Sequence, residues 1–378
     1  MPCEHGHGFP LLEFGESLGQ DRRYKIVRKL GWGMNSSTWL VYDQQSQTYL
    51  ALKALTGHCT QCVQKGLSWE LKALTRVSSP PHKHCLQLKD SFTIPGKGSA
   101  GSHLCLVTSL LAGDLKSVWG PRLPLPLAKR ILLHTLRGLA HAHRSGVVHT
   151  DLKPDNIFIG NVMLTGDIDS LLQANSSRRH EAEASYDGIV QAAVSQPLPG
   201  PSLEDGMSRT YVLADFGSAQ PIDQHLTDLI TAESLRPPEI WLGGPWNEKV
   251  DIWTFGCLVF ELVVGTRLFV PEPKTVENVA LDATESVLYQ MMCFTQEDFT
   301  AENLQVSSRA GQWFNLTCNL KKGPRLLNYE YADIIDRYKV ASRTDAESMG
   351  TLLKRCLRLD PSERPSAEDL LSDAWFSG

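Results

Sequence analysis

A lysine, a glycine-rich run and several acids in this 378-residue chain have the types and spacing that suit the chemistry of phosphate esters. The run Gly31-Trp32-Gly33-Met34-Asn35-Ser36 lies between two strand-like stretches, so its glycines permit a tight hairpin whose backbone N–H groups can approach phosphate oxygens. A plain hairpin turn explains the run equally well. A Rossmann turn is disfavoured, because a strand rather than a helix follows.

Lys53 and Glu70 strengthen the phosphate interpretation. Lys53 ends the strand-like run Ala51-Leu52-Lys53, and Glu70 stands inside a helical pattern over residues 63–76. A lysine that contacts phosphates needs an acidic partner to fix its position. The two residues together therefore favour a phosphate site over a plain turn.

The most specific signal is a series of polar motifs from the middle of the chain onward. In chain order they are His149-Thr150-Asp151-Leu152-Lys153-Pro154-Asp155-Asn156, Asp215-Phe216-Gly217, Arg236-Pro237-Pro238-Glu239, Asp251-Ile252-Trp253-Thr254-Phe255-Gly256, and Arg364 within residues 361–365. With these motifs the chain resembles the eukaryotic protein kinases from about residue 21 to residue 376. The last three motifs distinguish protein kinases from the distantly related small-molecule kinases.

The resemblance implies a role for each polar residue of the central motifs, because phosphoryl transfer needs charge neutralisation and in-line placement. Asp151 is expected to orient the substrate hydroxyl and accept its proton, and Lys153 to neutralise the moving γ-phosphoryl group. Asp215 is expected to bind a Mg²⁺ that bridges the phosphates of ATP, and Asn156 a second Mg²⁺.

The same resemblance implies an ATP site between two lobes. Lys53, held by Glu70, would contact the α and β phosphates, and Thr108 takes the gatekeeper position beside the adenine. The residues expected to contact the nucleotide are Leu30, Gly31, Gly33, Ser36, Thr38, Ala51, Lys53, Glu70, Thr108, Ser109 and Leu111. Three further residues are expected to support the site without touching ATP: Glu239 and Arg364 as a buried ion pair, and Asp251 as an acceptor for backbone N–H groups of the catalytic loop.

The elements that must position these residues form an α+β, bilobal fold. Strand-like runs with one helical pattern fill the first part, and helical patterns dominate from residue 127 onward. We expect an N-terminal tail over residues 1–20, a mainly antiparallel N-lobe over 21–111 and a larger helical C-lobe over 112–378. Residues 173–208 are rich in Ser, Ala, Pro, Gly and charged residues with little that could form a core, which predicts a mobile insertion.

Composition excludes other classes of function. The net charge of -5 argues against a protein that binds the phosphate backbone of nucleic acids. Apolar stretches such as residues 257–264 fall short of the roughly 20 residues that a bilayer span requires, so no membrane partner is expected. The nine scattered cysteines and the absence of a secretory signal predict reduced thiols in the cytoplasm and nucleus, and we expect a monomer.

For the cysteines and histidines outside these motifs, the favoured interpretation is a structural role. Cys59 and Cys62 have thioredoxin-like spacing with His58 alongside, but no second pair completes a zinc site, and a redox or metal role stays open. The histidines at 134, 141 and 143 lack the four-residue spacing that pairs ligands on a helix face, and those at 5 and 7, with the cysteine at 3, lie in the expected tail.

Three features resemble the SR-protein kinases of the CMGC group, and particularly their compact fungal relatives. These are Ser36 at the third glycine position, Thr150 where most kinases have arginine, and the insertion before residues 213–220. Arg236 before Pro237-Pro238-Glu239 agrees with the CMGC group. The resemblance implies a serine/threonine kinase whose protein substrates carry Arg/Ser-rich tracts, as splicing factors do.

Substrate choice and regulation are less strongly indicated than catalysis. Glu277, Asp282 and Glu285 are sparse for a groove that binds arginine, and solvated helix faces are their favoured interpretation. Thr150 cannot bind a phosphorylated activation segment as arginine does, which predicts constitutive activity, with apolar residues between 226 and 235 holding that segment. The alternative function is a kinase-fold scaffold, or pseudokinase, whose site residues bind nucleotide only for stability.

Overall fold

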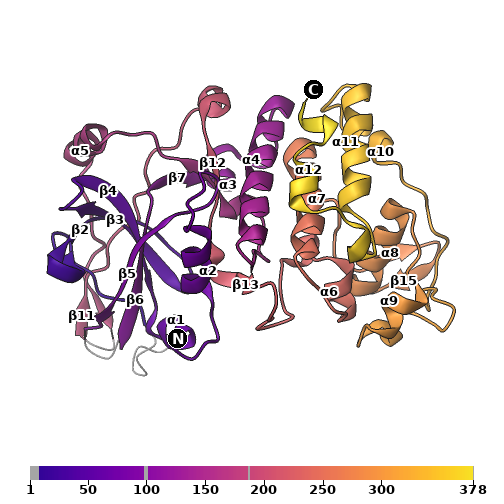
Figure 1. Ribbon diagram of the computed structural model, residues 1–378, viewed down its shortest axis with the longest axis horizontal. Helices are drawn as coiled ribbons and strands as arrows, with labels where there is room; N and C mark the ends of the chain where they lie inside the picture. Colours follow the sequence, from indigo (N-terminus) through magenta and orange to yellow (C-terminus); the bar gives the residue numbers. More distant parts are fainter. Residues whose placement is uncertain (1–7, 98–100, 186–187, 378) are drawn as a thin grey trace. The chain divides into compact units, whose positions relative to one another are not determined.

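The computed structural model describes residues 8–97, 101–185 and 188–377. The chain divides into two compact units (Figure 1). Unit 1 comprises Met1–Gly113 with Phe158–Ser202, and unit 2 comprises Asp114–Ile157 with Leu203–Gly378. Unit 1 is built on an antiparallel sheet and unit 2 mainly on helices, which confirms the predicted α+β fold class.

A six-stranded antiparallel sheet is the framework of the described part of unit 1. Its strands, in spatial order, are β1 (Ser17–Leu18), β2 (Tyr24–Trp32), β3 (Ser36–Asp43), β4 (Thr48–Leu55), β6 (Ser102–Thr108) and β5 (Leu88–Pro95). Side chains alternate between the two faces, so that Tyr24 and Ile26 are buried while Lys25 between them is exposed. This alternation gives the sheet an apolar face around which a core can form.

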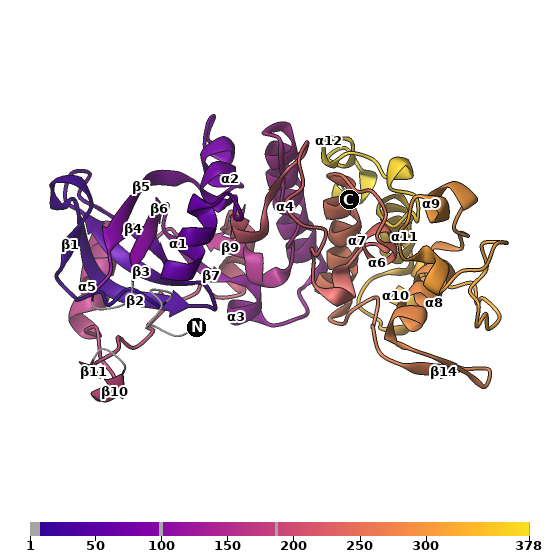
Figure 2. The same ribbon diagram turned by 90° about the horizontal axis from the view of Figure 1, so that it is seen from below.

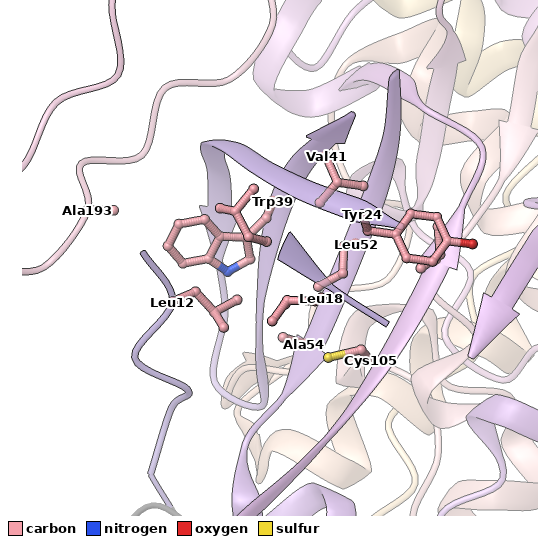
Figure 3. Close-up of a cluster of buried hydrophobic side chains, with 11 residues drawn as sticks. Leu12, Leu18, Tyr24, Trp39, Val41, Leu52, Ala54, Cys105 and Ala193 are labelled. Atoms are coloured by element: carbon pink, nitrogen blue, oxygen red, sulfur yellow. The ribbon is translucent and has the colours of Figure 1, made fainter. Parts of the chain in front are cut away.

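The core on this face contains residues from outside the sheet as well (Figure 3). Leu12 precedes the first strand, and Ala193 comes from the segment expected to be a mobile insertion. Figure 3 shows Leu12 close to Trp39, with Leu18 and Leu52 deeper in the cluster. The expected tail over residues 1–20 is therefore wrong for its second half. Leu12 and Leu18 bury apolar surface here, and Ser17 and Leu18 pair with β2.

The single helix expected over residues 63–76 is two helices in the described structure. α1 spans Gly57–Gln64 and α2 spans Glu70–Val77. Gly66 between them has a φ of 73°, a left-handed conformation that ends a helix and that glycine adopts without strain. The helical pattern in the sequence continues across this break, so periodicity alone could not place it.

The described part of the 173–208 segment packs against folded structure. The last two residues of α5 (Thr165–Ala174) begin it, and the hairpin of β10 (Glu183–Ser185) and β11 (Gly188–Val190) lies within it (Figure 2). Leu198 is buried in a cluster with Leu40 and Ala51 of the sheet, and Gln196 N donates to Lys29 O at 2.8 Å. The expectation of a mobile insertion with little that could form a core is wrong for the described part of this segment, because Ala193 and Leu198 are buried in clusters with residues of the sheet.

We predict that Leu198→Ala destabilises unit 1 by about 2–3 kcal/mol, the usual cost of removing a buried leucine side chain. Ile189→Ala is the matched control, because Ile189 lies in the same segment of unit 1 and is 77% exposed whereas Leu198 is 6% exposed. Urea denaturation followed by tryptophan fluorescence gives both free energies of unfolding. Equal stabilities for the two variants would mean that the segment contributes no core.

Unit 2 is mainly helical. Its helices are α3 (Leu115–Trp119), α4 (Leu125–Arg144), α6 (Pro238–Leu242), α7 (Lys249–Val264), α8 (Ala283–Thr295), α9 (Ala301–Gln305), α10 (Tyr331–Arg337), α11 (Arg343–Cys356) and α12 (Ala367–Leu370). β8 (Val147–Val148) pairs with β13 (Gln220–Pro221), and β14 (Lys274–Val276) pairs with β15 (Val279–Leu281) in a hairpin that extends from the helices (Figure 2).

Helix α7 is the centre of unit 2. Apart from Lys249, Asp251 and Glu261 it is mainly apolar on every side, and it is almost completely buried, as expected of a helix surrounded by other elements. A Cβ added at Gly256 would lie 2.8 Å from Cys356 Cβ, so glycine is needed for the close approach of α11. Among the described residues, no helix is long and apolar enough to cross a membrane.

Candidate active site

Lys53 and Glu70 form an ion pair between the sheet and α2, as the sequence predicts. Lys53 Nζ lies 2.5 Å from Glu70 Oε1. Glu70 is buried in the first turn of α2, where the positive end of the helix dipole favours a carboxylate. The pair fixes the Lys53 ammonium on the sheet, and its contact with phosphates stays a prediction.

The glycine-rich run forms the hairpin between β2 and β3, closed by Gly33 N donating to Ser36 O at 2.9 Å. A Cβ built on Gly31 or Gly33 meets no described atom within 4 Å, and neither glycine has a positive φ. Internal packing and backbone strain therefore do not require glycine at either position. This favours the other reason for glycine, namely close approach of a ligand to the backbone.

The remaining residues assigned to the nucleotide also lie in unit 1. Ala51 pairs with Thr108 across the sheet, and both are buried. Ser109 N donates to Gln87 O at 3.0 Å, so the backbone that follows the gatekeeper is held by the neighbouring loop. The register of β3 with β4 places Thr38 opposite Lys53.

The proposed base and its neighbours form one connected group in unit 2. Lys153 Nζ lies 2.7 Å from Asp151 Oδ2. The amide of Asn156 donates to Asp151 O at 2.7 Å and to Asp151 Oδ2 at 3.0 Å. Asn156 is buried while Asp151 is partly exposed, so the carboxylate is held in one orientation and stays reachable by a substrate.

Asp251 anchors the loop that carries Asp151. Its carboxylate accepts hydrogen bonds from His149 N and Thr150 N, both at 2.8 Å, and lies 2.9 Å from His143 Nε2. Full burial alone would raise the pKa of Asp251. The hydrogen bond and charge of His143, with the contribution of His149, outweigh burial and hold this pKa below its ordinary value. The carboxylate therefore stays ionised and keeps the loop in place.

Asp215 and Asn156 are the expected metal ligands, and the described atoms fit an ion that prefers oxygen. Both amide hydrogen bonds of Asn156 use its nitrogen, and no described group donates to its side-chain oxygen. Asp215 is exposed and has a φ of 55°, an uncommon conformation outside glycine that is typical of functional sites. Ala214 N donates to Asn156 O at 2.9 Å, which ties the two ligand-bearing segments together.

Side-chain hydrogen bonds order the segment that follows Asp215. Thr150 Oγ1 donates to Ser218 O at 2.7 Å. Gln220, which is buried, accepts from Leu226 N at 2.6 Å and donates to Thr227 O at 2.9 Å. Of the apolar residues expected to hold this segment, those at 230 and 235 are buried, whereas Leu226 and Leu229 are exposed. Hydrogen bonds therefore provide much of the order that the sequence assigned to packing.

An aromatic clamp, defined as His225, Asp228 and Trp246, fastens the same segment to the loop before α7. The rings of His225 and Trp246 stack with centroids 3.4 Å apart and planes 8° from parallel. Trp246 Nε1 donates to Asp228 Oδ1 at 2.9 Å. The buried indole of Trp246 therefore contacts both ends of the stretch from His225 to Asp228.

Glu239 and Arg364 form the buried ion pair expected from the sequence. The guanidinium donates two parallel hydrogen bonds of 2.7 and 2.8 Å to the two carboxylate oxygens. It also lies over the Trp253 ring, 5.1 Å from its centroid. Paired hydrogen bonds of this kind are among the strongest that a protein makes.

The acids considered for an arginine-binding groove take part in local structure instead. Glu285 is buried, accepts from Lys322 Nζ at 2.8 Å and forms a capping box with Asp282 at the start of α8. Glu277 accepts from Arg325 N at 3.2 Å. The favoured interpretation as solvated helix faces is wrong for Glu285, which is buried. Glu277 and Asp282 are exposed, but they lie in the turn between β14 and β15 and at the N-cap of α8 and not on a helix face.

Sequence reasoning missed four residues that shape the site: His143, Gln220, His225 and Trp246. For His143 the sequence predicted only a structural role, and its only sequence signal is its place in the last turn before the catalytic loop. Gln220 and Trp246 follow known motifs at short distance, but nothing in their spacing indicates a partner. Their roles depend on contacts that the folded chain makes.

The chain is similar to known protein kinases over nearly its whole length. A family model described as protein kinase domain matches residues 24–184 and 202–376, and the gap falls within the 173–208 segment. Serine/threonine-protein kinase SRPK of Physarum polycephalum is 27% identical, with 98% of this chain and 89% of that protein covered. Protein kinase dsk1 of Schizosaccharomyces pombe is 23% identical (98% and 84%), and SRSF protein kinase 3 of Mus musculus is 24% identical (94% and 86%).

Proposed function

The chain belongs to the protein kinase family as a serine/threonine kinase of the SR-protein-kinase type, and from this premise we propose that it phosphorylates serines of Arg/Ser-rich proteins without prior activation. The observation that carries the substrate class is the similarity to SRSF protein kinase 3 over 94% of the chain. Splicing factors with Arg/Ser tracts are the proposed partners of a monomeric enzyme in the cytoplasm and nucleus.

The geometry of unit 2 suits transfer of a phosphoryl group to a hydroxyl. Asp151, oriented by Asn156, accepts the proton of the substrate serine as its oxygen attacks the γ-phosphorus. Lys153, 2.7 Å from Asp151, places a positive charge where negative charge moves onto the transferred group. Mg²⁺ bound by Asp215 and Asn156 would supply further neutralisation of the phosphate oxygens.

The substrate proposal is tested with three substrates in the presence of ATP and Mg²⁺. An Arg/Ser repeat peptide should be phosphorylated in preference to a Lys/Ser peptide of equal charge and to a generic basic protein, because guanidinium groups bind carboxylates in a bidentate manner. Equal use of both peptides would contradict the Arg/Ser proposal. Labelling of none of the three would favour the scaffold function.

The proposal of constitutive activity is supported by hydrogen bonds that order the segment after Asp215 without a phosphorylated residue. The residue before Asp151 is Thr150, whose hydroxyl holds Ser218 O, and Thr231 N donates to Thr150 O at 3.1 Å. The Arg236 guanidinium donates hydrogen bonds to Ile230 O and Thr231 O, at 3.3 and 3.1 Å. These hydrogen bonds, with Gln220 and the aromatic clamp, give the segment its order without added charge.

We predict that phosphatase treatment leaves the activity of bacterially expressed protein unchanged. Thr227→Ala combined with Thr231→Ala should change kcat by less than roughly tenfold, about 1.4 kcal/mol. Steady-state rates with a peptide substrate provide the measurement. In the same assay Trp246→Ala, which removes the aromatic clamp, should raise KM for the peptide more than KM for ATP. Loss of activity on phosphatase treatment, restored by another kinase, would contradict this proposal.

A further inference from the structure

We propose that the enzyme phosphorylates its own Ser176, and that the phosphate binds the buried guanidinium of Arg28. Arg28 is the observation that carries the proposal. Its side chain is only 1% exposed, yet among the described residues no carboxylate pairs with it. A buried charge without a counter-charge is unfavourable, so this position favours an anion that the unmodified chain does not supply.

The guanidinium of Arg28 has hydrogen-bond donors to offer such an anion. One terminal nitrogen donates to Asn175 O, and the buried Nε has no acceptor in the part of the chain that the structure describes. Burial, and after it the positive charge of Arg178, lower the pKa of Arg28. Arg178 is exposed and forms no ion pair with a described residue. Two such guanidinium groups close together are well suited to bind a phosphate.

Ser176 places a hydroxyl within reach of Arg28. The carbonyl of Asn175, to which Arg28 donates, belongs to the peptide group that joins Asn175 to Ser176. A phosphorus atom on Ser176 Oγ lies close to Cα in the chain of bonds, so rotation about the Cα–Cβ bond carries it past that peptide group. Arg178 follows two residues later. A phosphate on Ser176 can therefore approach both guanidinium groups with little movement of the backbone.

Ser176 is also chemically available. Its side chain is exposed, and its hydroxyl forms no hydrogen bond with the described residues, whereas its carbonyl accepts from Gln196 Nε2 at 3.1 Å. The serines directly next to an arginine differ, because each of their hydroxyls is hydrogen-bonded: Ser145, Ser177, Ser208, Ser308 and Ser342. Phosphorylation of Ser176 would break no hydrogen bond of its side chain.

The transfer step rests on the proposed function, because Ser176 shortly precedes Arg178 and Arg179 and so offers serine in an arginine-rich context. Ser176 Oγ forms a bond to the γ-phosphorus of ATP while the bond from that phosphorus to the bridging oxygen of ADP breaks. The hydroxyl proton passes to Asp151 of the enzyme that carries out the transfer. The products are ADP and a phosphoserine.

The phosphate would fasten the start of the 173–208 segment to β2. Ser177 Oγ already donates to Val27 O at 2.8 Å and holds the unmodified segment there. Charge-assisted hydrogen bonds to Arg28 would add to this contact without involving the catalytic loop. We therefore expect that phosphorylation slows proteolytic cleavage within the segment at least about threefold, because local opening becomes less favourable, and that kcat stays unchanged.

Mass spectrometry of phosphatase-treated protein, after incubation with ATP and Mg²⁺, tests the modification. Ser176 should carry phosphate in most chains, and Ser176→Ala should lack this phosphate. Ser91→Ala is the matched control and should keep it, since Ser91 is an exposed serine of unit 1 with no arginine near it in the chain. Asp151→Asn protein treated in the same way should stay unmodified at Ser176.

Phosphorus NMR of the modified protein tests the contact with Arg28. An exposed phosphoserine has a second pKa of about 6. The two guanidinium groups favour the doubly charged phosphate, so the second acid dissociation constant of phosphorylated Ser176 should be at least about tenfold larger. Arg28→Gln should abolish this difference, and Arg178→Gln should reduce it. Arg178 is exposed, so the second variant decides the test if the first fails to fold.

The outcomes separate this inference from the proposed function. Phosphate on an Arg/Ser peptide but not on Ser176 would overturn the inference and leave the proposed function intact, whereas labelling of neither would overturn both. Phosphate on Ser176 of Asp151→Asn protein would show that another kinase is responsible and would overturn self-modification. An ordinary second pKa in wild-type protein, or a tenfold difference that persists in folded arginine variants, would overturn the contact with Arg28.

Discussion

Replacing Asp151 by asparagine should lower kcat by on the order of 10²-fold or more while KM for ATP changes little. Asparagine has nearly the same shape as aspartate, so the hydrogen bond from Asn156 can persist. The side chain can no longer accept the substrate proton, and the charge beside Lys153 is lost. The expected defect is therefore in the chemical step and not in nucleotide binding.

Asp155→Asn is the matched control for this variant. Asp155 lies in the same loop and carries the same charge, but it is exposed and pairs with Lys116 at 2.8 Å. Its turnover should stay within a few-fold of wild type, because an exposed ion pair contributes little. Initial rates at varied ATP and peptide concentrations separate kcat from KM. An Asp151→Asn enzyme with full turnover would remove Asp151 from the mechanism.

Glu239→Ala should destabilise unit 2 by about 3–5 kcal/mol, the cost found when one partner of a buried ion pair is removed. The side chain of Arg364 is completely buried, and Glu239 accepts one hydrogen bond from each of its two terminal nitrogens. Without the carboxylate, Arg364 would be a buried charge that lacks its counter-charge. The free energy of unfolding, measured by urea denaturation, gives the result directly.

Two further variants show whether the loss comes from the unpaired charge. Glu368→Ala removes a carboxylate that pairs with Arg144 at the surface and should change stability little. Combining Glu239→Ala with Arg364→Met should recover part of the lost stability, since no buried charge then remains. A single Glu239→Ala variant as stable as Glu368→Ala would contradict the structural role of the pair.

Residues close together in the chain could be assigned from the sequence. Asp151, Lys153 and Asn156 lie within six positions, so a tight loop must bring them together whatever surrounds it. Lys53 and Glu70 were predictable as a pair, because Lys53 ends a strand-like run and Glu70 stands in the helical pattern that follows it in the chain. The distant pair of Glu239 and Arg364 was predictable only through the resemblance to a known family.

The sequence by itself determined the fold class, the residue types of the catalytic loop and the family, because these depend on local spacing and on motifs. Only the tertiary structure decided that residues 12, 193 and 198 are buried, that His143 holds Asp251 and that Trp246 stacks on His225. The physical reason is that burial and side-chain hydrogen bonds between distant residues depend on where the backbone runs. A polar, proline-rich segment has no periodicity that indicates its partner, so the surface that it covers becomes known only when the chain is folded.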